Sequence, residues 1–389
     1  MIHDYSVKLK DIIVEEPKYM VRRAELKIGT SISIDENMKI LRTPLKSLDL
    51  KLHEVYLELN EGKIKRIDSD NREKDKFISY LNKKMRNDKV NVVVTNVVFY
   101  GSPSQELLEE VLEFFLDIIC SNIFTRLVTP PKLIIKESFK GKEIVDGDLN
   151  KQYFLDFLKL MKGQSVAVKP LYFIPSYTSR KTLPDLMKLY IDAFGPDGIF
   201  VIDMNRGRFT NGGYVTVAQI IRLMRTEYRH EDYGIYLFNH KPRKKSGKEV
   251  PSEDLIAVLS GTNLIGNLHS NIPLPPRVLE IMKEETAEKT KILNDVDFLY
   301  YPLDRAPNKA DFTKFLTKEI GVGSSSFRFY HVNLYNDLIT NIAIRQLKAE
   351  DVIRIKLSSL KREEFVKELY ISSRRVFDIL KNKDLSNAF

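Results

Sequence analysis

Short segments in which apolar and polar residues alternate fill the first part of the chain. Residues 19–28 and 55–59 show this alternation, and turn residues at Gly29 and at positions 60–62 separate the segments. A period of two is typical of β-strands that bury one face. We therefore predict a β-rich N-terminal part over residues 1–88.

From residue 89 the pattern changes to short, almost continuous apolar runs that alternate with amphipathic helical segments. The runs at 89–96 and 132–135 are followed by helical patterns at 104–120 and 150–161. Near-continuous apolar strands are typical of parallel sheets that helices cover. A parallel α/β organisation is therefore expected to begin here.

The clearest alternation lies between residues 164 and 305. Strands are predicted at 165–171, 198–205, 233–240, 263–269 and 297–301, and helices at 183–194, 217–227, 252–259 and 277–293. No glycine-rich phosphate loop follows these strands in the sequence, which argues against a nucleotide-binding doubly wound sheet. We predict an α/β fold, a (β/α)8 TIM-type barrel over residues 89–349, with a C-terminal helical extension over 350–389.

The single cysteine limits the kinds of site that the chain can build. Cys120 is the only cysteine among 389 residues, which excludes a disulfide framework and a cysteine-rich zinc site. No segment reaches the roughly 20 apolar residues of a membrane helix, and the first ten residues do not resemble a signal peptide. We expect a cytoplasmic protein without membrane contact.

The charge balance favours an anionic partner. The formal net charge is +9 and the isoelectric point is about 9.2. A basic balance fits nucleic acid, although a solvated surface also explains runs of lysine. The cations that we assign to nucleic-acid binding follow two predicted strands: Arg206, Arg208, Lys241, Arg243, Lys244, Lys245 and Lys248.

Polar side chains gather at the ends of the predicted strands. In a barrel these ends form the mouth, where working side chains lie. The candidates for catalysis are Asp203, His240 and His269, because carboxylates and imidazoles exchange protons near neutral pH. The candidates for substrate binding are Lys169, Asn205, Asn239, Asn267 and Tyr300. The alternative is that these polar residues only mark where strands leave the core and cap turns.

A metal site is a weaker interpretation of the same residues. Asp203, His240 and His269 could approach one another as ligands, in a metal-dependent barrel hydrolase or nuclease. No local spacing of the His-Glu-x-x-His kind supports this. We therefore expect no metal and no cofactor, and keep the hydrolase as an alternative function. An inert barrel that only binds other proteins is a third hypothesis.

Five short passages together resemble the tRNA-guanine transglycosylase family, whose members exchange a guanine base in tRNA on a (β/α) barrel. Their order and spacing agree with that family over roughly residues 40–350. The passages are Arg42-Thr43-Pro44-Leu45, the hydrophobic-Thr-Asn strand at 92–96, the Gly-Asn-Leu-His stretch within 264–273, residues 296–300, and His331-Val332-Asn333-Leu334-Tyr335.

The resemblance implies altered chemistry. Tyr300 stands where the family places its aspartate nucleophile, and a phenol does not readily form the same glycosyl ester. The family's second acidic segment has no counterpart, and its zinc cluster needs three cysteines. The resemblance therefore implies a divergent, non-catalytic or chemically altered paralogue that binds tRNA and supports a catalytic transglycosylase subunit, or forms a homodimer.

Overall fold

The computed structural model describes most of the chain up to residue 347. The described residues are 5–14, 20–29, 32–34, 37–41, 45, 48, 50–136, 147–164, 169–207, 209, 211–240, 250–269, 290–323 and 329–347. The C-terminal extension expected over 350–389 and most of the helix expected over 277–293 lie outside these ranges.

An antiparallel sheet opens the chain. It has the order β1 (Tyr5–Val14), β2 (Met20–Ile28) and β3 (Ile32–Ile34), and Tyr5 pairs with Ile28. Tyr5 and Val7 are buried while the residue between them is exposed. The alternation in the sequence therefore arises because one face of this sheet packs on the core.

Two parallel sheets form the centre of the molecule and confirm the α/β organisation. The larger has the order β4–β13–β11–β10–β9, with every neighbouring pair parallel. Its strands are β4 (Met38–Lys39), β9 (Tyr172–Ile174), β10 (Ile199–Asp203), β11 (Gly234–Phe238) and β13 (Leu264–Ile265). All residues of β9, β10 and β11 are buried, which explains their continuous apolar character.

The second parallel sheet is built around β6 (Val90–Tyr100). It pairs in parallel with β5 (Leu52–Asn60) on one edge, and with β7 (Thr125–Val128) and β8 (Lys132–Lys136) on the other. The N-terminal β-layer expected over residues 1–88 includes β4 and β5, but both pair in parallel with later strands. For β5 the reason is that α1, which follows it directly, packs on both β5 and β6, so the chain crosses over between these two strands.

A small antiparallel sheet lies apart from the parallel strands. Its order is β12 (Val250–Pro251), β15 (Leu299–Pro302) and β14 (Lys291–Leu293). A strand is present near the expected range 297–301, but it pairs antiparallel, so the prediction that it belongs to the parallel series was wrong. The short reversal between Leu293 and Leu299 leaves no room for a crossover helix, so these strands can only pair antiparallel.

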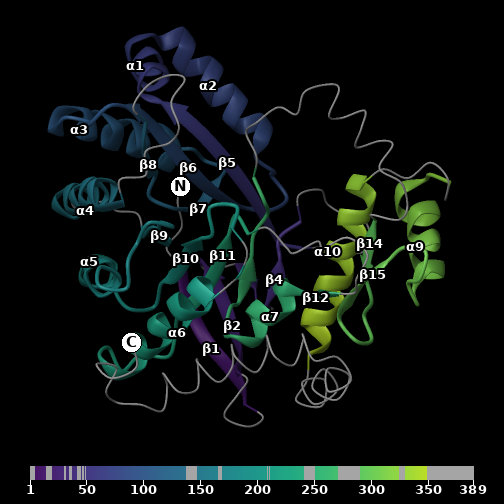
Figure 1. Cartoon of the computed structure of the whole chain (residues 1–389). Coiled ribbons are helices and arrows are strands. Elements are labelled where there is room, and N and C mark those ends of the chain that lie inside the picture. Colours follow the sequence, from purple (N-terminus) through teal and green to yellow (C-terminus); the bar gives the residue numbers. More distant parts are fainter. Residues whose placement is uncertain are drawn as a thin grey trace.

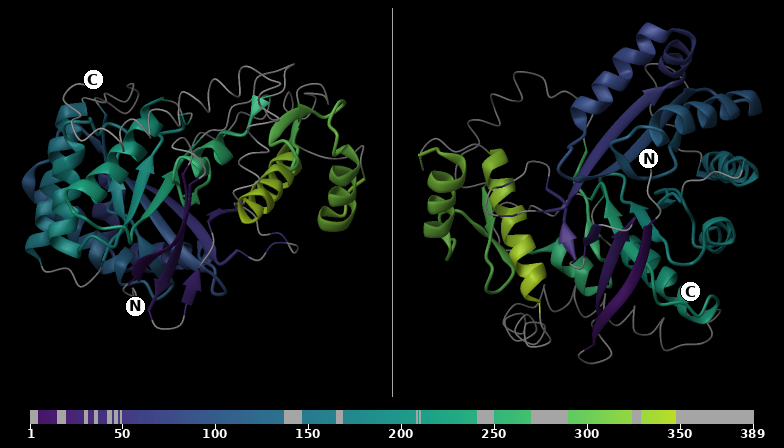
Figure 2. Two further views of the ribbon diagram at one scale, coloured as in Figure 1. Left: turned by 90° about the horizontal axis from the view of Figure 1, so that it is seen from below. Right: turned by 180° about the vertical axis from the view of Figure 1, so that it is seen from behind.

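Helices surround the parallel strands (Figure 1). The α-helices are α1 (Glu61–Ser69), α2 (Asn71–Lys84), α3 (Gln105–Phe114), α4 (Gly147–Gly163), α5 (Leu183–Phe194), α6 (Asn211–Thr226), α7 (Glu253–Leu259), α9 (Lys309–Phe315) and α10 (Phe329–Gln346), and two π-helical turns are η1 (Phe115–Cys120) and η2 (Leu316–Ile320). Figure 2 shows α9, α10, β14 and β15 together at one end of the molecule. Among the described helices, none combines the length and apolar character that a membrane crossing requires.

Candidate functional site

Parallel pairing brings the carboxyl ends of several strands to one side of the molecule. Asp203 ends β10 and is level with Phe238, which ends β11. Lys132 begins β8 but lies level with Asn96, well along β6, because β7 occupies the earlier part of that edge. Side chains from the two parallel sheets therefore meet at this end.

An ion pair between Lys132 and Asp203 joins the two sheets. The Lys132 Nζ lies 2.7 Å from the Asp203 Oδ2, and both side chains are buried. The same ammonium group lies 3.3 Å from the Asn205 Oδ1, and the Asn205 backbone amide donates to the other Asp203 oxygen. Both oxygens of the Asp203 carboxylate therefore have partners within the protein.

Lys132 was not among the residues chosen from sequence. Its only signal is a lysine at the start of an apolar strand, directly after Pro130 and Pro131. A buried lysine is rare unless it is paired, so that position could have been flagged without identifying its partner.

A second cluster surrounds the buried carboxylate of Glu54 in β5. Its two oxygens contact the His269 Nε2 and the Tyr236 hydroxyl, and the Asn267 backbone amide donates to it over 3.1 Å. A Cβ at Gly266 would collide with both the Glu54 carboxylate and the Tyr236 hydroxyl. Glycine is therefore required there for the chain after β13 to approach Glu54 so closely. Sequence reasoning missed Glu54 because it lies inside a strand that we placed in another layer.

Aromatic rings complete the second cluster. The His269 ring stacks on the Tyr56 ring, with centroids 4.6 Å apart and an interplanar angle of 13°, and also lies 5.5 Å from the Phe238 ring. The Asn96 side-chain amide donates to the Tyr56 hydroxyl over 2.8 Å. Phe238 and Asn96 are buried, so this arrangement leaves open the half-buried Tyr56 ring beside an imidazole whose side chain is 12% exposed.

The loops after β10, β11 and β13 are strained and tied together. Asn205, Arg206 and Asn239 have φ values of 45°, 62° and 55°, in the left-handed region that glycine usually occupies. The Arg206 backbone amide donates to the Asn239 carbonyl, and the Asn239 side-chain oxygen accepts from the His269 backbone amide. The Arg206 Nε donates to the His269 carbonyl over 2.9 Å. Strain of this kind is concentrated at functional sites.

The structure thus brings together six of the residues proposed from sequence. Asp203, Asn205, Arg206, Asn239, Asn267 and His269 lie in the three linked loops or at the strand ends that lead into them.

His240 and Tyr300 lie elsewhere, in a buried cluster of charged side chains. The His240 Nδ1 lies 3.0 Å from the Asp254 Oδ1, and its Nε2 lies 3.5 Å from the Glu253 Oε2. Lys39 bridges Asp254 at 2.6 Å. His240 immediately follows Asn239, whose side chain lies in the linked loops, so the two side chains diverge and His240 does not accompany His269.

The charges of this cluster hold each other in their ionised forms. Burial alone would lower the pKa of His240, but the adjacent Asp254 and Glu253 carboxylates outweigh this and raise it. Burial would likewise lower the pKa of Lys39, but Asp254 and Asp337 raise it. Burial raises the pKa of Tyr300, so its phenol is neutral. These groups form a buried network of ion pairs.

Lys169 lies at the opposite end of the sheet from the candidate site. We expected a strand over 165–171 with Lys169 near its end. Residues 165–168 lie outside the described residues, and the paired strand that is described, β9 (Tyr172–Ile174), begins after Lys169 instead of ending near it. The Lys169 Nζ pairs at 2.6 Å with Asp197, which precedes β10. The lysine therefore closes the amino-terminal end of the strands.

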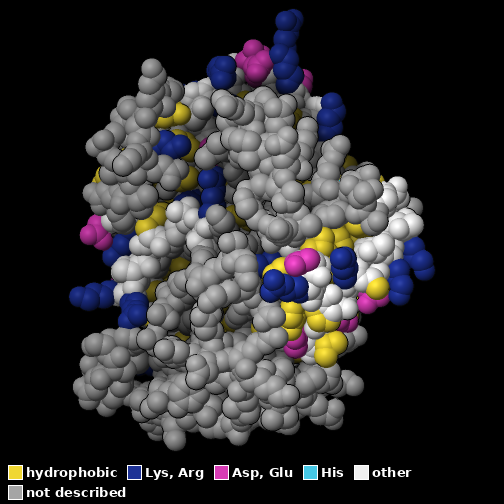
Figure 3. Space-filling model, turned by 45° about the vertical axis from the view of Figure 1, so that its right-hand side comes forward, with side chains coloured by type: hydrophobic (Ala, Val, Ile, Leu, Met, Phe, Trp, Pro, Cys, Tyr) yellow, Lys and Arg dark blue, Asp and Glu magenta, His cyan; other side chains and the backbone are white. Residues whose placement is uncertain are grey.

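Most cations assigned to nucleic-acid binding lie outside the described residues: Arg208, Lys241, Arg243, Lys244, Lys245 and Lys248. Of that set only Arg206 is placed, in the strained loop beside His269. On the face shown in Figure 3, the described Lys and Arg side chains lie at several separate places.

The three residues considered for a metal are separated by their partners. Asp203 is paired with Lys132, His240 with Asp254, and His269 with Glu54. Within the described ranges, no three His, Cys, Asp or Glu side chains are grouped closely enough to hold a metal ion.

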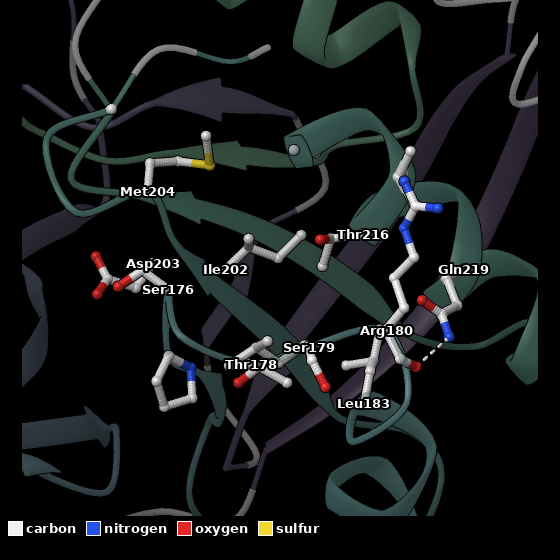
Figure 4. Close-up of a pocket in the computed structure, with 15 residues that line it drawn as sticks. Ser176, Thr178, Ser179, Arg180, Leu183, Ile202, Asp203, Met204, Thr216 and Gln219 are labelled. Atoms are coloured by element: carbon white, nitrogen blue, oxygen red, sulfur yellow. Dashed lines mark hydrogen bonds between the residues drawn. The ribbon is translucent and has the colours of Figure 1, made fainter. Parts of the chain in front are cut away.

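A pocket opens beside Asp203. Its volume is about 470 Å³, and it lies between the loop after β9 and the first turns of α6. Figure 4 shows the polar side chains that surround it, with Asp203 on one side and Arg180 on the other. The candidate site is therefore an ion pair, a histidine cluster and an adjoining pocket along one end of the parallel strands.

Comparison of the chain with protein-family models, with curated proteins and with solved protein structures gives no match.

Proposed function

We propose that the parallel strands close into one barrel whose mouth binds tRNA. Two contacts between the parallel sheets support the closure. The Leu171 amide, just before β9, donates to the Val128 carbonyl of β7 over 2.7 Å. On the other side, Glu54 of β5 accepts from the Asn267 amide after β13. The strand order β4–β13–β11–β10–β9–β7/β8–β6–β5 would then form a ring with a single mouth.

The observation that carries the proposal is the histidine cluster at this mouth. The half-buried Tyr56 ring and the partly exposed His269 ring offer surfaces for stacking. The buried Phe238, Asn96 and Asn239 side chains hold these two residues in place. RNA-binding proteins recognise unstacked bases by such aromatic stacking and hydrogen bonding. The basic charge of the chain adds attraction to phosphates that does not depend on sequence.

The chain in this proposal is a transglycosylase-like protein without the family's base exchange. Tyr300, at the position that the resemblance matches to the nucleophile, is a buried neutral phenol in the antiparallel sheet. Asp203, the other acidic candidate, is anchored by Lys132. These two facts favour a tRNA-binding paralogue that supports a catalytic subunit over an enzyme that forms a glycosyl ester itself.

The test is binding of the purified chain to a tRNA pool and to duplex DNA of similar length, at low and at near-physiological salt. A preference for tRNA that persists at the higher salt is expected, because stacking and base contacts are less sensitive to salt than phosphate contacts. Tyr56→Leu should remove this preference, whereas Tyr80→Leu, on the exposed surface of α2, should not. Equal binding to both nucleic acids, vanishing with salt, would refute the proposal.

Base exchange is tested separately with labelled guanine. The chain alone should incorporate none into tRNA. Incorporation by the chain alone would show that it is an active transglycosylase and would contradict the accessory role.

A further inference from the structure

The pocket beside Asp203 has the size and the lining of a site for one nucleotide. Its volume of about 470 Å³ falls within the range of small-molecule pockets. A loop, a strand end and a helix form most of it. The loop after β9 contributes Pro175, Ser176 and residues 178–180, the end of β10 contributes residues 202–204, and α6 contributes residues up to Gln219.

Hydroxyl and amide groups dominate the polar part of the lining. Ser176, Thr178 and Ser179 follow one another on the loop after β9, and Thr216 and Gln219 project from α6 on the facing side (Figure 4). The Gln219 side-chain amide donates to the Arg180 carbonyl over 2.9 Å and fixes this loop against the helix. Neutral donors and acceptors at this density suit a polar, hydroxyl-rich ligand rather than an apolar one.

A cation borders one side of the pocket. Among the described residues that line it, Arg180 and Asp203 are the charged ones, and they lie on opposite sides of it. A guanidinium group binds phosphate oxygens. The Asp203 side chain is only 1% exposed, and its two oxygens are taken by Lys132 and by the Asn205 amide. The groups of this side that are left for sugar hydroxyls are therefore the neutral hydroxyls of the loop after β9, among them Ser176 beside Asp203.

The start of α6 adds a second feature suited to an anion. Gly213, in the first turn of this 16-residue helix, lines the pocket, and a Cβ there would lie 2.7 Å from the Phe209 ring. The absence of a side chain lets the backbone of the first turn lie against Phe209 and border the pocket. Amide groups of a first helical turn lack partners within the helix and attract negative charge.

We infer that this pocket binds a 5′-phosphorylated ribonucleotide, with the phosphate toward Arg180 and the ribose hydroxyls toward Ser176 on the opposite side. The inference rests on the proposed function in so far as that nucleotide is one unit of the bound tRNA. A free mononucleotide has the same chemistry, and binding measurements distinguish the two sources.

The first measurement is calorimetric titration of the full chain with GMP, dGMP, guanosine and inorganic phosphate. GMP should bind at least about tenfold more tightly than guanosine, which lacks the phosphate, and more tightly than dGMP, which lacks the 2′-hydroxyl. Equal affinity for GMP and guanosine, or binding of none of the four, would overturn the inference.

Two variants in the same turn provide a matched pair. Arg180→Ala should weaken the binding of GMP about tenfold. Lys181→Ala removes a neighbouring exposed cation that does not line the pocket, and it should leave the affinity for GMP unchanged. Equal losses of GMP affinity in both variants would show that any nearby cation has this effect, and would contradict the assignment of the phosphate to Arg180. Thr216→Val, which keeps the shape but removes a lining hydroxyl, should also weaken GMP.

The same variants separate this inference from the proposed function. If Arg180→Ala weakens both GMP and tRNA, the pocket holds one unit of the RNA. If tRNA affinity is unchanged in Arg180→Ala and GMP does not bind, the inference fails while tRNA binding stands. If GMP binds but the wild-type chain does not prefer tRNA, the proposed function fails and the pocket is assigned to a free nucleotide.

Discussion

The two histidine clusters of this protein use the same kinds of residue in opposite ways. His269 contacts Glu54 and is 12% exposed, beside strained loops and aromatic rings. The His240 side chain is 1% exposed and contacts Asp254 and Glu253, and these two carboxylates raise its pKa. The comparison teaches that a histidine next to a carboxylate indicates function only where solvent and a ligand can reach it.

The largest predicted difference between the two clusters is the loss of stability that follows when a carboxylate of the His240 cluster is removed. Asp254→Asn removes a carboxylate that faces both Lys39 and His240, and leaves two buried cations with less compensation. Breaking one partner of such a network costs about 3–5 kcal/mol in the free energy of unfolding. Denaturant unfolding measures the loss. Glu73→Gln, in the exposed pair with Lys76, is the control and should leave stability almost unchanged, because solvent screens an exposed ion pair. A similarly small loss for Asp254→Asn would mean that the buried network is not structural.

The next effect should be on RNA binding rather than stability. His269→Ala removes the ring that stacks on Tyr56 and contacts Glu54, and it should weaken the binding of tRNA about tenfold. His230→Ala, at the opposite end of the strands before β11, is the matched control and should bind tRNA like the wild type. Binding isotherms at one salt concentration provide the comparison. If His240→Ala weakened tRNA binding of the folded chain as much as His269→Ala, the distinction between the clusters would fail.

The smallest effect should be the pH dependence of stability. The pKa of His240 is raised in the folded chain above its usual value of about 6.5, so protonation stabilises the folded state. This contribution is fully present below about pH 6.5 and is lost as the pH rises through the folded-state value. As the pH rises above about 6.5, the thermal midpoint of the wild type should therefore fall relative to the thermal midpoint of His240→Gln. A constant difference between the two proteins would show that His240 does not change its charge on folding.

Sequence periodicity predicted the type of most elements, because periodicity reflects burial. The helices expected at 183–194 and 252–259 match α5 and α7, and the apolar runs near 199 and 234 match β10 and β11. Pairing was less predictable. β5 carries the alternation of an antiparallel strand, yet it pairs in parallel with β6, because the helix that follows decides which strands can meet.

The candidate site shows the same division. Asp203, Asn239 and His269 were predictable, since polar residues at the ends of apolar strands stand out in the sequence. Their partners Lys132 and Glu54 come from strands 71 and 215 positions away, and nothing in the local pattern connects them. Lys169 was misplaced because a strand boundary read from apolar residues is uncertain by a few positions, which here moves a side chain to the other end of the sheet.

By itself, the sequence determined the α/β character, the basic charge, the exclusion of a cysteine-rich zinc site and the polar strand ends. These properties follow from composition and from periodicity over neighbouring residues. Only the tertiary structure decided that β4 and β5 join parallel sheets, that Asp203 is paired with Lys132, and that His240 and His269 serve different clusters. The physical reason is that ion pairs and side-chain accessibility depend on which distant segments pack together, and this depends on the pairing of the strands.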